Sequence, residues 1–492
     1  MNAHLPNGTA SHAVDVDAGL DDLPLYVAAE HVYSQRVHGF YRRVKWTLLV
    51  LTLGVYYLLP FARWDRGPSE PSQAVMVDLA RRRFYFFFIE IWPQEVYYLT
   101  GLLIIAAFTL FLMNAVAGRV WCGYLCPQTV WTDLFTFAER LIEGDRRERI
   151  AKDQGPWTFQ KVREKALKHT VWLLIAWWTG GVWVLYFEDA PTLVRKLATF
   201  TAEPVAYLWI GILTFTTYVL AGHMREQVCL YMCPWPRIQA ALTDENALNV
   251  TYRSDRGEPR MSLKKAEAAR QHGAAAGDCV DCGQCVAACP TGVDIREGAS
   301  LGCIQCGLCI DACDAVMKRI HRPERLIAYD TDVNIKRRRA GEQPIYRLIR
   351  ARTALYACLI AFVGLTMLYA LVTRSDFGVA AIHDRNPLYT RLADGAVHNA
   401  YELRVANKKP SDRRFVLTIE GVPAARFEVV GAGAGDEADM LLVGPDQTRE
   451  VRVLVSVSAP LEGSSTPIVF RVADSQTGKS AWTRDFFDSP PQ

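Results

Sequence analysis

Two cysteine runs of the same form lie close together in this 492-residue chain. The first is Cys279-x2-Cys282-x2-Cys285-x3-Cys289, and the second is Cys303-x2-Cys306-x2-Cys309-x3-Cys313. In bacterial two-cluster ferredoxins, three thiolates of one run and the fourth of the other bind each [4Fe–4S] cluster. The spacing therefore predicts two clusters. Their expected ligands are Cys279, Cys282, Cys285 and Cys313 for cluster 1, and Cys303, Cys306, Cys309 and Cys289 for cluster 2.

A zinc ribbon is the alternative assignment for these cysteines. Zinc ribbons commonly use separated C-x2-C pairs, whereas each run here has three cysteines in series closed by a fourth. The pattern therefore favours iron–sulfur clusters over zinc.

A second cysteine pattern, C-x3-C-P, occurs at residues 122–127 and again at residues 229–234. Cysteines at i and i+4 share one face of a helix, so each pair can present two sulfurs to one ion or partner. Proline disfavours the helical conformation in the residue before it, so we expect a helix break at Cys126 and at Cys233. A new helix is expected to start at Pro127.

The four thiols of these motifs are candidates for redox or metal chemistry. Arg119 and Arg225 lie nearby in the sequence. Because a helix N-terminus and a neighbouring arginine lower the pKa of a thiol, we expect lowered pKa values for these cysteines. Thiolates bind soft ions such as Cu(I), zinc or the iron of a cluster. The plainer interpretation is that these cysteines are structural, but the motif occurs twice in matching places. We therefore expect a site at Cys122, Cys126, Cys229 and Cys233, which could bind copper, form disulfides or hold another cluster.

Hydrophobic segments must hold these motifs at a membrane. Half of the residues are hydrophobic and the mean hydropathy is +0.04, which predicts a mixture of membrane and soluble domains. A helix needs about 20 apolar residues to cross a hydrocarbon core of about 30 Å. Five segments satisfy this, near residues 44–62, 97–116, 170–187, 204–221 and 353–372. The first 40 residues show no cleavable signal peptide, so the first span is expected to be an uncleaved anchor.

Basic residues are distributed unevenly among the loops. They are abundant before the first span, between spans two and three and between spans four and five, whereas the loop between spans three and four has only Arg195 and Lys196. By the positive-inside rule, the N-terminus and the cysteine runs lie in the cytoplasm and the C-terminus in the periplasm. Arg63, Arg66 and Arg81 to Arg83 lie in a loop where that rule expects few basic residues.

This topology of an inner-membrane protein suits the cysteines. Twelve of the thirteen fall in expected cytoplasmic segments or helix ends, where reducing conditions protect thiolates from disulfide formation. Cys358 lies within the last span and is expected to act as a small buried hydrophobic residue.

The sequence after Arg374 changes to short strands separated by turn residues, which predicts a small immunoglobulin-like β-sandwich. The strands are expected at residues 401–405, 414–419, 426–430, 449–457 and 467–472. The fold class is thus a polytopic α-helical membrane protein with a two-cluster ferredoxin insert and an all-β C-terminal sandwich. Its expected parts are a cytoplasmic tail (1–40), a four-helix membrane domain carrying both C-x3-C-P motifs (41–245), the cytoplasmic ferredoxin domain with linkers (246–340), a fifth transmembrane helix (341–374) and the periplasmic sandwich (375–492).

Other cofactors and partners leave little trace in the sequence. His38, His169 and His223 lie at expected span ends, and no facing pair in mid-membrane could ligate a haem. No flavin or nicotinamide site is visible, so we expect the electron donor to be a quinol or another redox protein. The basic run Lys336 to Arg339 precedes a span and is expected to anchor the chain at anionic lipid, not to bind nucleic acid.

In this order of motifs, the chain resembles the CcoG/FixG/RdxA family of cytochrome c oxidase accessory proteins, from about Tyr33 to the C-terminus. Asp314 stands where the second cysteine run often carries proline, and we expect this to alter the loop but not the ligation. The most specific stretches are Phe84-Tyr85, Trp92-Pro93-Gln94, Gly118 to Trp131, Arg225 to Cys229, Cys233 to Arg237 and His383 to Pro387.

The resemblance implies a role in building a cbb(3)-type haem–copper oxidase, by reducing Cu(II) to Cu(I) before copper reaches the catalytic subunit. Copper would then be the substrate, and the C-x3-C-P cysteines would be the copper or redox thiols. The implied partners are the oxidase assembly machinery and copper-handling proteins, and a homodimer is left open. Two alternatives are a quinol-linked membrane electron-transfer module and a non-enzymatic scaffold for oxidase assembly.

Overall fold

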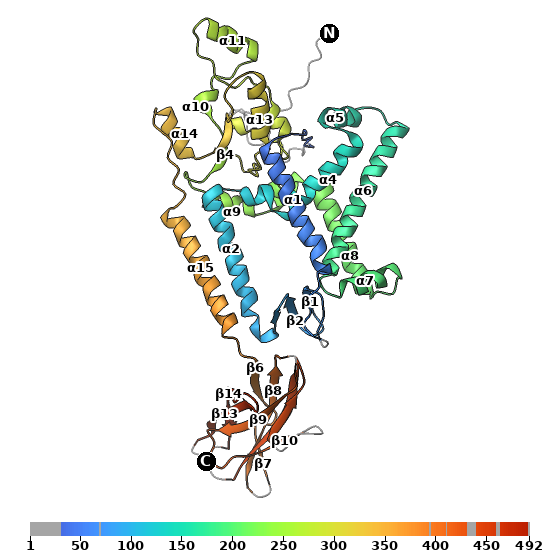
Figure 1. Ribbon diagram of the computed structural model, residues 1–492, viewed down its shortest axis with the longest axis vertical. Coiled ribbons are helices and arrows are strands. Elements are labelled where there is room, and N and C mark those ends of the chain that lie inside the picture. The colour runs from blue at the N-terminus through green and yellow to red at the C-terminus, as the bar shows by residue number, and fades with distance from the viewer. Residues whose placement is uncertain are drawn as a thin grey trace, which may run out of the picture. The chain divides into compact units, whose positions relative to one another are not determined.

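The computed structural model describes residues 31–67, 70–392, 395–409, 411–430, 439–458 and 463–490, so most of the expected N-terminal tail lies outside the described residues. The chain folds as two compact units (Figure 1). Unit 1 comprises residues 1–52, 113–176 and 215–350, and unit 2 comprises residues 53–112, 177–214 and 351–492. The chain passes from one unit to the other five times, each time within or beside one of the five expected spans.

Four helices among the described residues are long and apolar enough to cross a membrane. They match four of the expected spans to within a few residues. The apolar side chains of these helices are mostly not buried inside the protein, as expected for segments that face lipid. The four are α1 (Phe40–Leu58) with its 3-10 extension η2 (Leu59–Phe61), α2 (Tyr97–Ala117), α8 (Pro204–Thr217) with its π-helical extension η4 (Tyr218–Met224), and α15 (Ala351–Val372).

The expected third span, residues 170–187, lies in the second half of a longer helix, α6 (Phe159–Val184). This helix is not one of the four apolar helices. Its first turns carry Lys161, Lys165 and Lys168, and its apolar half ends at Val184, three residues earlier than expected. The sequence pattern therefore located an apolar segment but not the bounds of its helix.

Cys358 was expected to be buried within the last span, and that expectation is wrong. Its side chain is exposed on α15. The reason is that none of the most apolar stretch of this helix is buried inside the protein, although side chains such as Tyr356 contact α2.

The ferredoxin-like part of unit 1 is built from two short helices and a two-stranded sheet. Strand β4 (Asn249–Tyr252) pairs antiparallel with β5 (Ile327–Asp330). Helix α12 (Gln284–Ala288) ends at Cys289 because Pro290 follows, whereas α13 (Leu308–Arg319) continues through Asp314, where no proline interrupts it. The other elements of this part are α10 (Ser254–Gly257), α11 (Leu263–Gln271), η6 (Ile295–Glu297) and α14 (Asp332–Arg339).

Short helices surround the C-x3-C-P motifs in unit 1. Pro127 starts α4 as expected, because its ring fixes the backbone angle of a first helical turn. These helices are α3 (Val120–Tyr124), α4 (Pro127–Glu143), α5 (Arg146–Gln154), the π-helical η5 (Val228–Met232) and α9 (Trp235–Leu242).

Unit 2 contains a small antiparallel sheet that the sequence analysis did not anticipate. Its strands pair in the order β1-β2-β3, and Tyr85 at its centre is fully buried. The elements here are β1 (Val75–Asp78), β2 (Arg83–Phe86), β3 (Ile89–Ile91), η3 (Pro93–Glu95) and α7 (Ala190–Ala198).

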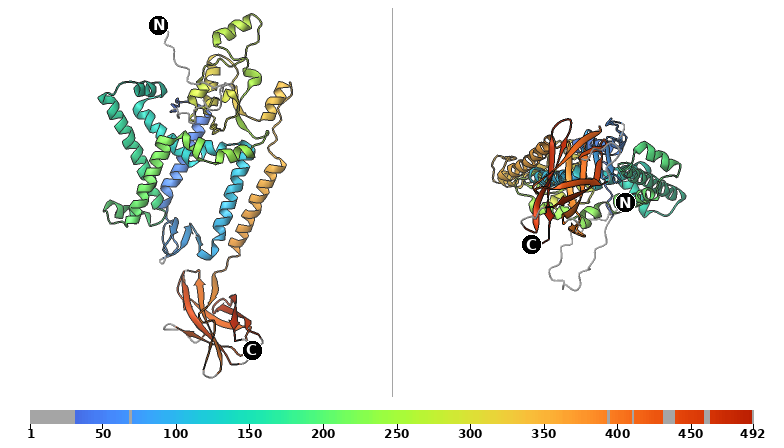
Figure 2. Two further views of the ribbon diagram at one scale, coloured as in Figure 1. Left: turned by 180° about the vertical axis from the view of Figure 1, so that it is seen from behind. Right: turned by 90° about the horizontal axis from the view of Figure 1, so that it is seen from below.

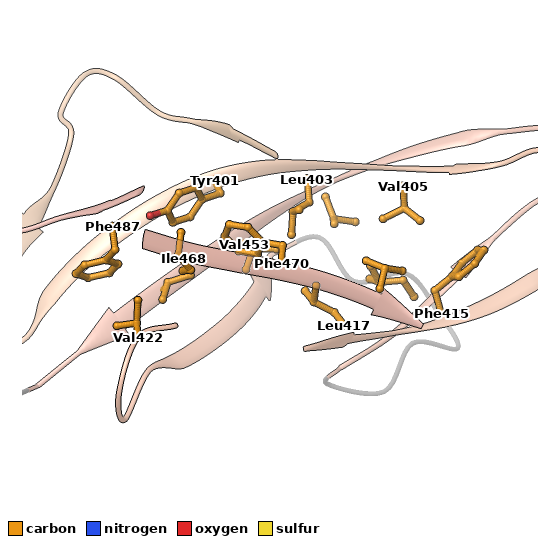
Figure 3. Packing of buried hydrophobic residues seen from close by; sticks show 14 of the residues in the cluster. Tyr401, Leu403, Val405, Phe415, Leu417, Val422, Val453, Ile468, Phe470 and Phe487 are labelled. Carbon is orange, nitrogen blue, oxygen red and sulfur yellow. The ribbon is translucent and has the colours of Figure 1, made fainter. Parts of the chain in front are cut away.

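The C-terminal part of unit 2 is a β-sandwich, as expected. One sheet has the order β10-β12-β8-β6, with β7 paired to β8, and the other has the order β11-β9-β13-β14. The strands of the sandwich are drawn in orange to red in Figure 2. Tyr401, Leu403 and Phe470 are fully buried between the sheets, as Figure 3 shows. The strands are β6 (Phe377–His383), β7 (Thr390–Arg391), β8 (Val397–Asn407), β9 (Arg413–Glu420), β10 (Arg426–Val430), β11 (Met440–Val443), β12 (Thr448–Val457), β13 (Ser465–Asp474) and β14 (Ser480–Asp488).

Candidate functional site

The two ferredoxin loops share one backbone conformation. Asp281 and Gln305, each just before the second cysteine of its run, have φ angles of 51° and 55°. Gly283 and Gly307, just after that cysteine, have φ angles of 66° and 72°. Left-handed residues at alternate positions curl the backbone so that its amides point to a common centre, a geometry that many iron–sulfur sites use. The repeated turn therefore gives each loop a cradle for a cluster.

The thiols fall into two groups that each combine both runs. The charge of Cys313 interacts with those of Cys285, Cys282 and Cys279. In the second run, the charge of Cys309 interacts most strongly with those of Cys306, Cys289 and Cys303. The fourth cysteine of each run thus lies near the first three of the other, in the same two sets that the spacing predicts. Their ligation of clusters stays a prediction.

Burial disfavours the charged thiolate form of these cysteines. It raises the pKa of Cys285, Cys303 and Cys313 to about 12. Backbone amides partly compensate, as that of Gln305 does by donating a hydrogen bond to the Cys303 sulfur. A buried thiolate is stable only beside a cation or a metal. The donor set therefore fits a bound metal group, which would stabilise the thiolates.

The way in which the two runs combine bears on the choice between zinc and a cluster. Each group of four cysteines takes three from one run and the fourth from the other, as in bacterial two-cluster ferredoxins. The grouping therefore agrees with the cluster assignment.

The first C-x3-C-P motif packs directly on the cluster-2 loop, which we define as residues 301–309. Cys122 is 8% exposed and lies in one apolar cluster with Ile304 and Cys306. A Cβ added to Gly123 would lie 2.7 Å from the Ile304 carbonyl oxygen and 3.0 Å from the Cys306 Cα. The Tyr124 hydroxyl donates a hydrogen bond to the Cys306 carbonyl oxygen at 2.9 Å. Glycine at position 123 is therefore required for this close approach of two backbones.

Arg119 also links the first C-x3-C-P motif to the cluster-2 loop. Its backbone amide donates to Gln305 Oε1 at 2.8 Å, and its guanidinium donates to the Leu301 carbonyl oxygen. The guanidinium also donates to Gln239 Oε1 at 3.2 Å, an oxygen that lies 3.4 Å from the Cys122 sulfur. Arg119 is thus a positioning residue between the thiol motif and the cluster-2 loop.

The second C-x3-C-P motif follows two π-helical segments. Arg225 lies between η4 and η5 with a φ angle of 41°, a conformation that residues other than glycine rarely adopt. π-Helical turns are rare and frequently mark functional sites. A Cβ added to Gly302 would lie 3.1 Å from a methyl carbon of Leu230, which stands between the two cysteines of this motif. The second motif therefore also contacts the cluster-2 loop.

The four C-x3-C-P thiols form a third group. The charge of Cys229 interacts with those of Cys126, Cys122 and Cys233. Cys126 and Cys233 both have extended backbone conformations before their prolines, so the two expected helix breaks are confirmed. The four thiols are therefore close enough for mutual electrostatic effects.

The expected lowering of thiol pKa values in these motifs is wrong for two cysteines. Burial raises the pKa of Cys122 to about 11, although Arg119 acts in the opposite direction. Burial likewise raises the pKa of Cys229 to about 12. The helix ends and arginines were correctly located, but contacts from distant parts of the chain bury the sulfurs, and desolvation outweighs the positive charge.

A buried ion network supports the second motif, and no sequence pattern predicted it. Glu139 Oε2 accepts from Arg225 and from Arg149, both at 2.9 Å, and Lys168 lies 3.4 Å from Oε1. Burial alone would raise the pKa of Glu139, but Arg225, Arg149 and Lys168 hold it below its ordinary value. The network fixes Arg225, whose strained backbone directs the chain toward Cys229.

Replacing Glu139 by glutamine should destabilise unit 1 strongly. The change leaves three buried cations without their shared carboxylate, a loss that typically costs about 3–5 kcal/mol. Because the pKa of Glu139 is lower in the folded state, its stabilisation is complete above the unfolded pKa and disappears as the pH falls through the folded one. Thermal unfolding of the purified protein in detergent measures both effects. Glu188→Gln, at the exposed pair with Lys196, should cost no more than about 1 kcal/mol, and an equal loss in both variants would contradict the role of the network.

Together, the apolar helices and the cysteine cradles define a membrane-bound iron–sulfur protein. Three family models match the chain: a 4Fe-4S dicluster domain at residues 224–332, a 4Fe-4S binding domain at residues 99–143, and the IG-like fold at the C-terminal of FixG at residues 367–490. The chain is 48% identical over 462 residues to "Nitrogen fixation protein FixG" of Rhizobium meliloti (strain 1021), covering 88% of each chain. It is also 48% identical over 457 residues to "Protein RdxA" of Cereibacter sphaeroides, covering 92% of this chain and 95% of that one.

The chain therefore belongs to the FixG/RdxA family. Among solved structures, the FixG-related protein from Vibrio parahaemolyticus matches with 20% identity and a TM-score of 0.21, covering 24% of this chain and 99% of that one. The 4Fe-4S binding model at residues 99–143 includes Cys122 and Cys126, two of the C-x3-C-P cysteines.

Proposed function

We propose that this protein is an inner-membrane oxidoreductase that reduces Cu(II) to Cu(I) for the assembly of a cbb(3)-type cytochrome oxidase. The observation that carries the proposal is the packing of both C-x3-C-P motifs on the cluster-2 loop, through Gly123 against Ile304 and through Leu230 against Gly302. A redox-active thiol group thus lies against a segment with three expected cluster ligands.

The ferredoxin cysteines hold two [4Fe–4S] clusters in this proposal, and such clusters supply single electrons when bound. Reduction of Cu(II) to Cu(I) also takes a single electron, so donor and substrate match without a flavin or nicotinamide. Thiolates are soft ligands that favour Cu(I). Cys122, Cys126, Cys229 and Cys233 would therefore receive copper where its reduced form is stabilised.

The surrounding residues keep this thiol group at a fixed position. Gly123 allows the backbones of the first motif and the cluster-2 loop to approach closely. Tyr124 donates a hydrogen bond to the Cys306 carbonyl oxygen. Arg119 donates hydrogen bonds to Gln305 and to Leu301 in the same loop. Cys122 is buried, Cys126 and Cys229 are partly buried, and Cys233 is the member of the group that is exposed to solvent.

The proposed topology places the N-terminus and the ferredoxin domain in the cytoplasm and the sandwich in the periplasm. The uneven distribution of basic residues supports it. In this proposed topology, α6 also crosses the membrane. Oxidase assembly factors and copper-handling proteins are the proposed partners, with a quinol or a redox protein as electron donor and a homodimer as an open possibility.

A second candidate is a membrane electron-transfer module in which the C-x3-C-P thiols hold a further cluster. The 4Fe-4S match over residues 99–143, which include Cys122 and Cys126, favours it. Iron and sulfide analysis after anaerobic purification distinguishes the two. Two clusters give about eight iron atoms per chain, whereas a third raises the content to about twelve. We expect about eight, together with Cu(II)-dependent oxidation of the reduced protein; about twelve iron atoms and no reaction with Cu(II) would support the second candidate.

A further inference from the structure

A basic cleft beside the start of α1 has no part in the copper chemistry. Its volume is about 510 Å³, and it lies wholly within unit 1. Five basic side chains and one acidic side chain line it. They are Arg36, His38, Arg42, Arg43, Arg140 and Asp145.

Arg140 makes no ion pair among the described residues, although the charges of Asp133 and of Asp145 in the same cleft act on it. One of its terminal nitrogens donates to the Ser34 hydroxyl at 2.8 Å, but its buried Nε has no hydrogen-bond partner. Burial lowers the pKa of Arg140 to about 10, and the charges of Arg42 and Arg149 act in the same direction. A guanidinium in such surroundings is stabilised by an anion.

Two further arginines stand at the mouth of the cleft. The side chains of Arg36 and Arg43 are exposed, and neither takes part in an ion pair within the described part of the chain. The single acid, Asp145, already accepts a hydrogen bond from the Arg36 backbone amide at 2.9 Å. Arg42 is also engaged, since its guanidinium bonds to Asp133 at 2.9 Å. The cleft thus has two exposed arginines, Arg36 and Arg43, that can meet an incoming anion, with the half-buried Arg140 beside them.

Apolar side chains form the other wall. The rings of Trp46 and Phe137 meet edge to face with their centroids 4.9 Å apart, and Leu141 follows Phe137 by one turn of α4. Phe137 is 38% exposed and Leu141 is 71% exposed. Trp46 lies in the first turns of α1, a helix suited to span a membrane, and tryptophan commonly lies at the level of lipid headgroups. The wall suits a ligand with an acyl chain, which a free phosphate lacks.

We propose that this cleft binds the headgroup of an anionic phospholipid. Its phosphate would lie among Arg36, Arg43 and Arg140, and its acyl chain would pack beside Phe137 and Leu141. Basic pockets beside membrane helices bind such headgroups by the same chemistry. Binding here would brace α1 against α4 at the membrane surface, and it does not depend on the copper reaction.

Native mass spectrometry of the full-length protein, exchanged into an equal mixture of phosphatidylglycerol and phosphatidylcholine, tests the proposal. The native protein should retain phosphatidylglycerol preferentially. The double variant R36Q/R43Q should bind it at least about tenfold more weakly, since each arginine near an anionic lipid surface contributes about fivefold. The matched control is R147Q/R163Q, which removes two other exposed arginines outside the cleft.

Retention by the control at the native level, with loss in R36Q/R43Q, is the result that we expect. Equal retention by the two double variants would overturn the proposal. Displacement of phosphatidylglycerol from the native protein by millimolar inorganic phosphate would also overturn it, because free phosphate would then be the ligand. Equal iron content in all three proteins confirms that each is folded.

Discussion

Serine at positions 122, 126, 229 and 233 together should abolish Cu(II) reduction by the purified protein while both ferredoxin clusters remain. Loss of groups that only support a metal ligand costs about 10- to 100-fold in affinity or activity, so loss of the ligands themselves should exceed about 100-fold. Anaerobic reduction of the protein, followed by Cu(II) addition and capture of Cu(I) with a chelating dye, measures the rate.

Cys358→Ser is the matched control for this variant. Cys358 is a free cysteine exposed on α15, so its replacement removes a thiol outside the proposed site. Its rate should equal that of the native protein. A quadruple variant that keeps its clusters and its full rate would show that copper is reduced elsewhere.

Alanine at position 123 should separate the first thiol motif from the cluster-2 loop. The added Cβ would lie 2.7 Å from the Ile304 carbonyl oxygen, which is closer than carbon and oxygen can approach, so one of the two backbones must move. A displacement of about 1 Å between reacting groups can cost about 100-fold in rate. We expect Cu(II) reduction to fall by about 10- to 100-fold, with a changed EPR signal from cluster 2 and an unchanged iron content.

Gly54→Ala provides the control for this second prediction. Gly54 lies in α1, and a Cβ added there meets nothing within 4 Å. This variant should keep the native rate and the native EPR signal. If Gly123→Ala behaved in the same way, the contact between the motif and the loop would have no role in electron transfer.

Sequence patterns predicted the features that depend on interactions between residues close together in the chain. The cysteine spacing that is repeated in the runs beginning at Cys279 and Cys303 predicted two similar loops. Both loops have the same left-handed turns. Proline predicted the breaks at Cys126 and Cys233 because its ring acts on the residue directly before it. Alternation of apolar residues located five strands of the sandwich. It missed β6, β7, β11 and β14, of which β7 and β11 are too short to show alternation.

Features that depend on distant contacts could not be predicted in this way. The pKa of Cys122 was misjudged because the residues that bury it, such as Ile304, lie far away in the sequence. Glu139 and Arg225 are 86 residues apart, and no pattern links them. The apposition of Gly123 and Ile304, on which the proposed function rests, is likewise a property of the folded chain alone.

The most direct test of the central claim is a single-turnover measurement on the native protein and the quadruple serine variant. Both are reduced anaerobically and mixed with Cu(II), while cluster absorbance and Cu(I) are followed in the same sample. In the native protein, we predict rapid oxidation of the clusters with about one Cu(I) formed for each cluster, because each supplies one electron. In the variant, the clusters should stay reduced at equal iron and sulfide content. Equally fast cluster oxidation in both proteins would contradict the account.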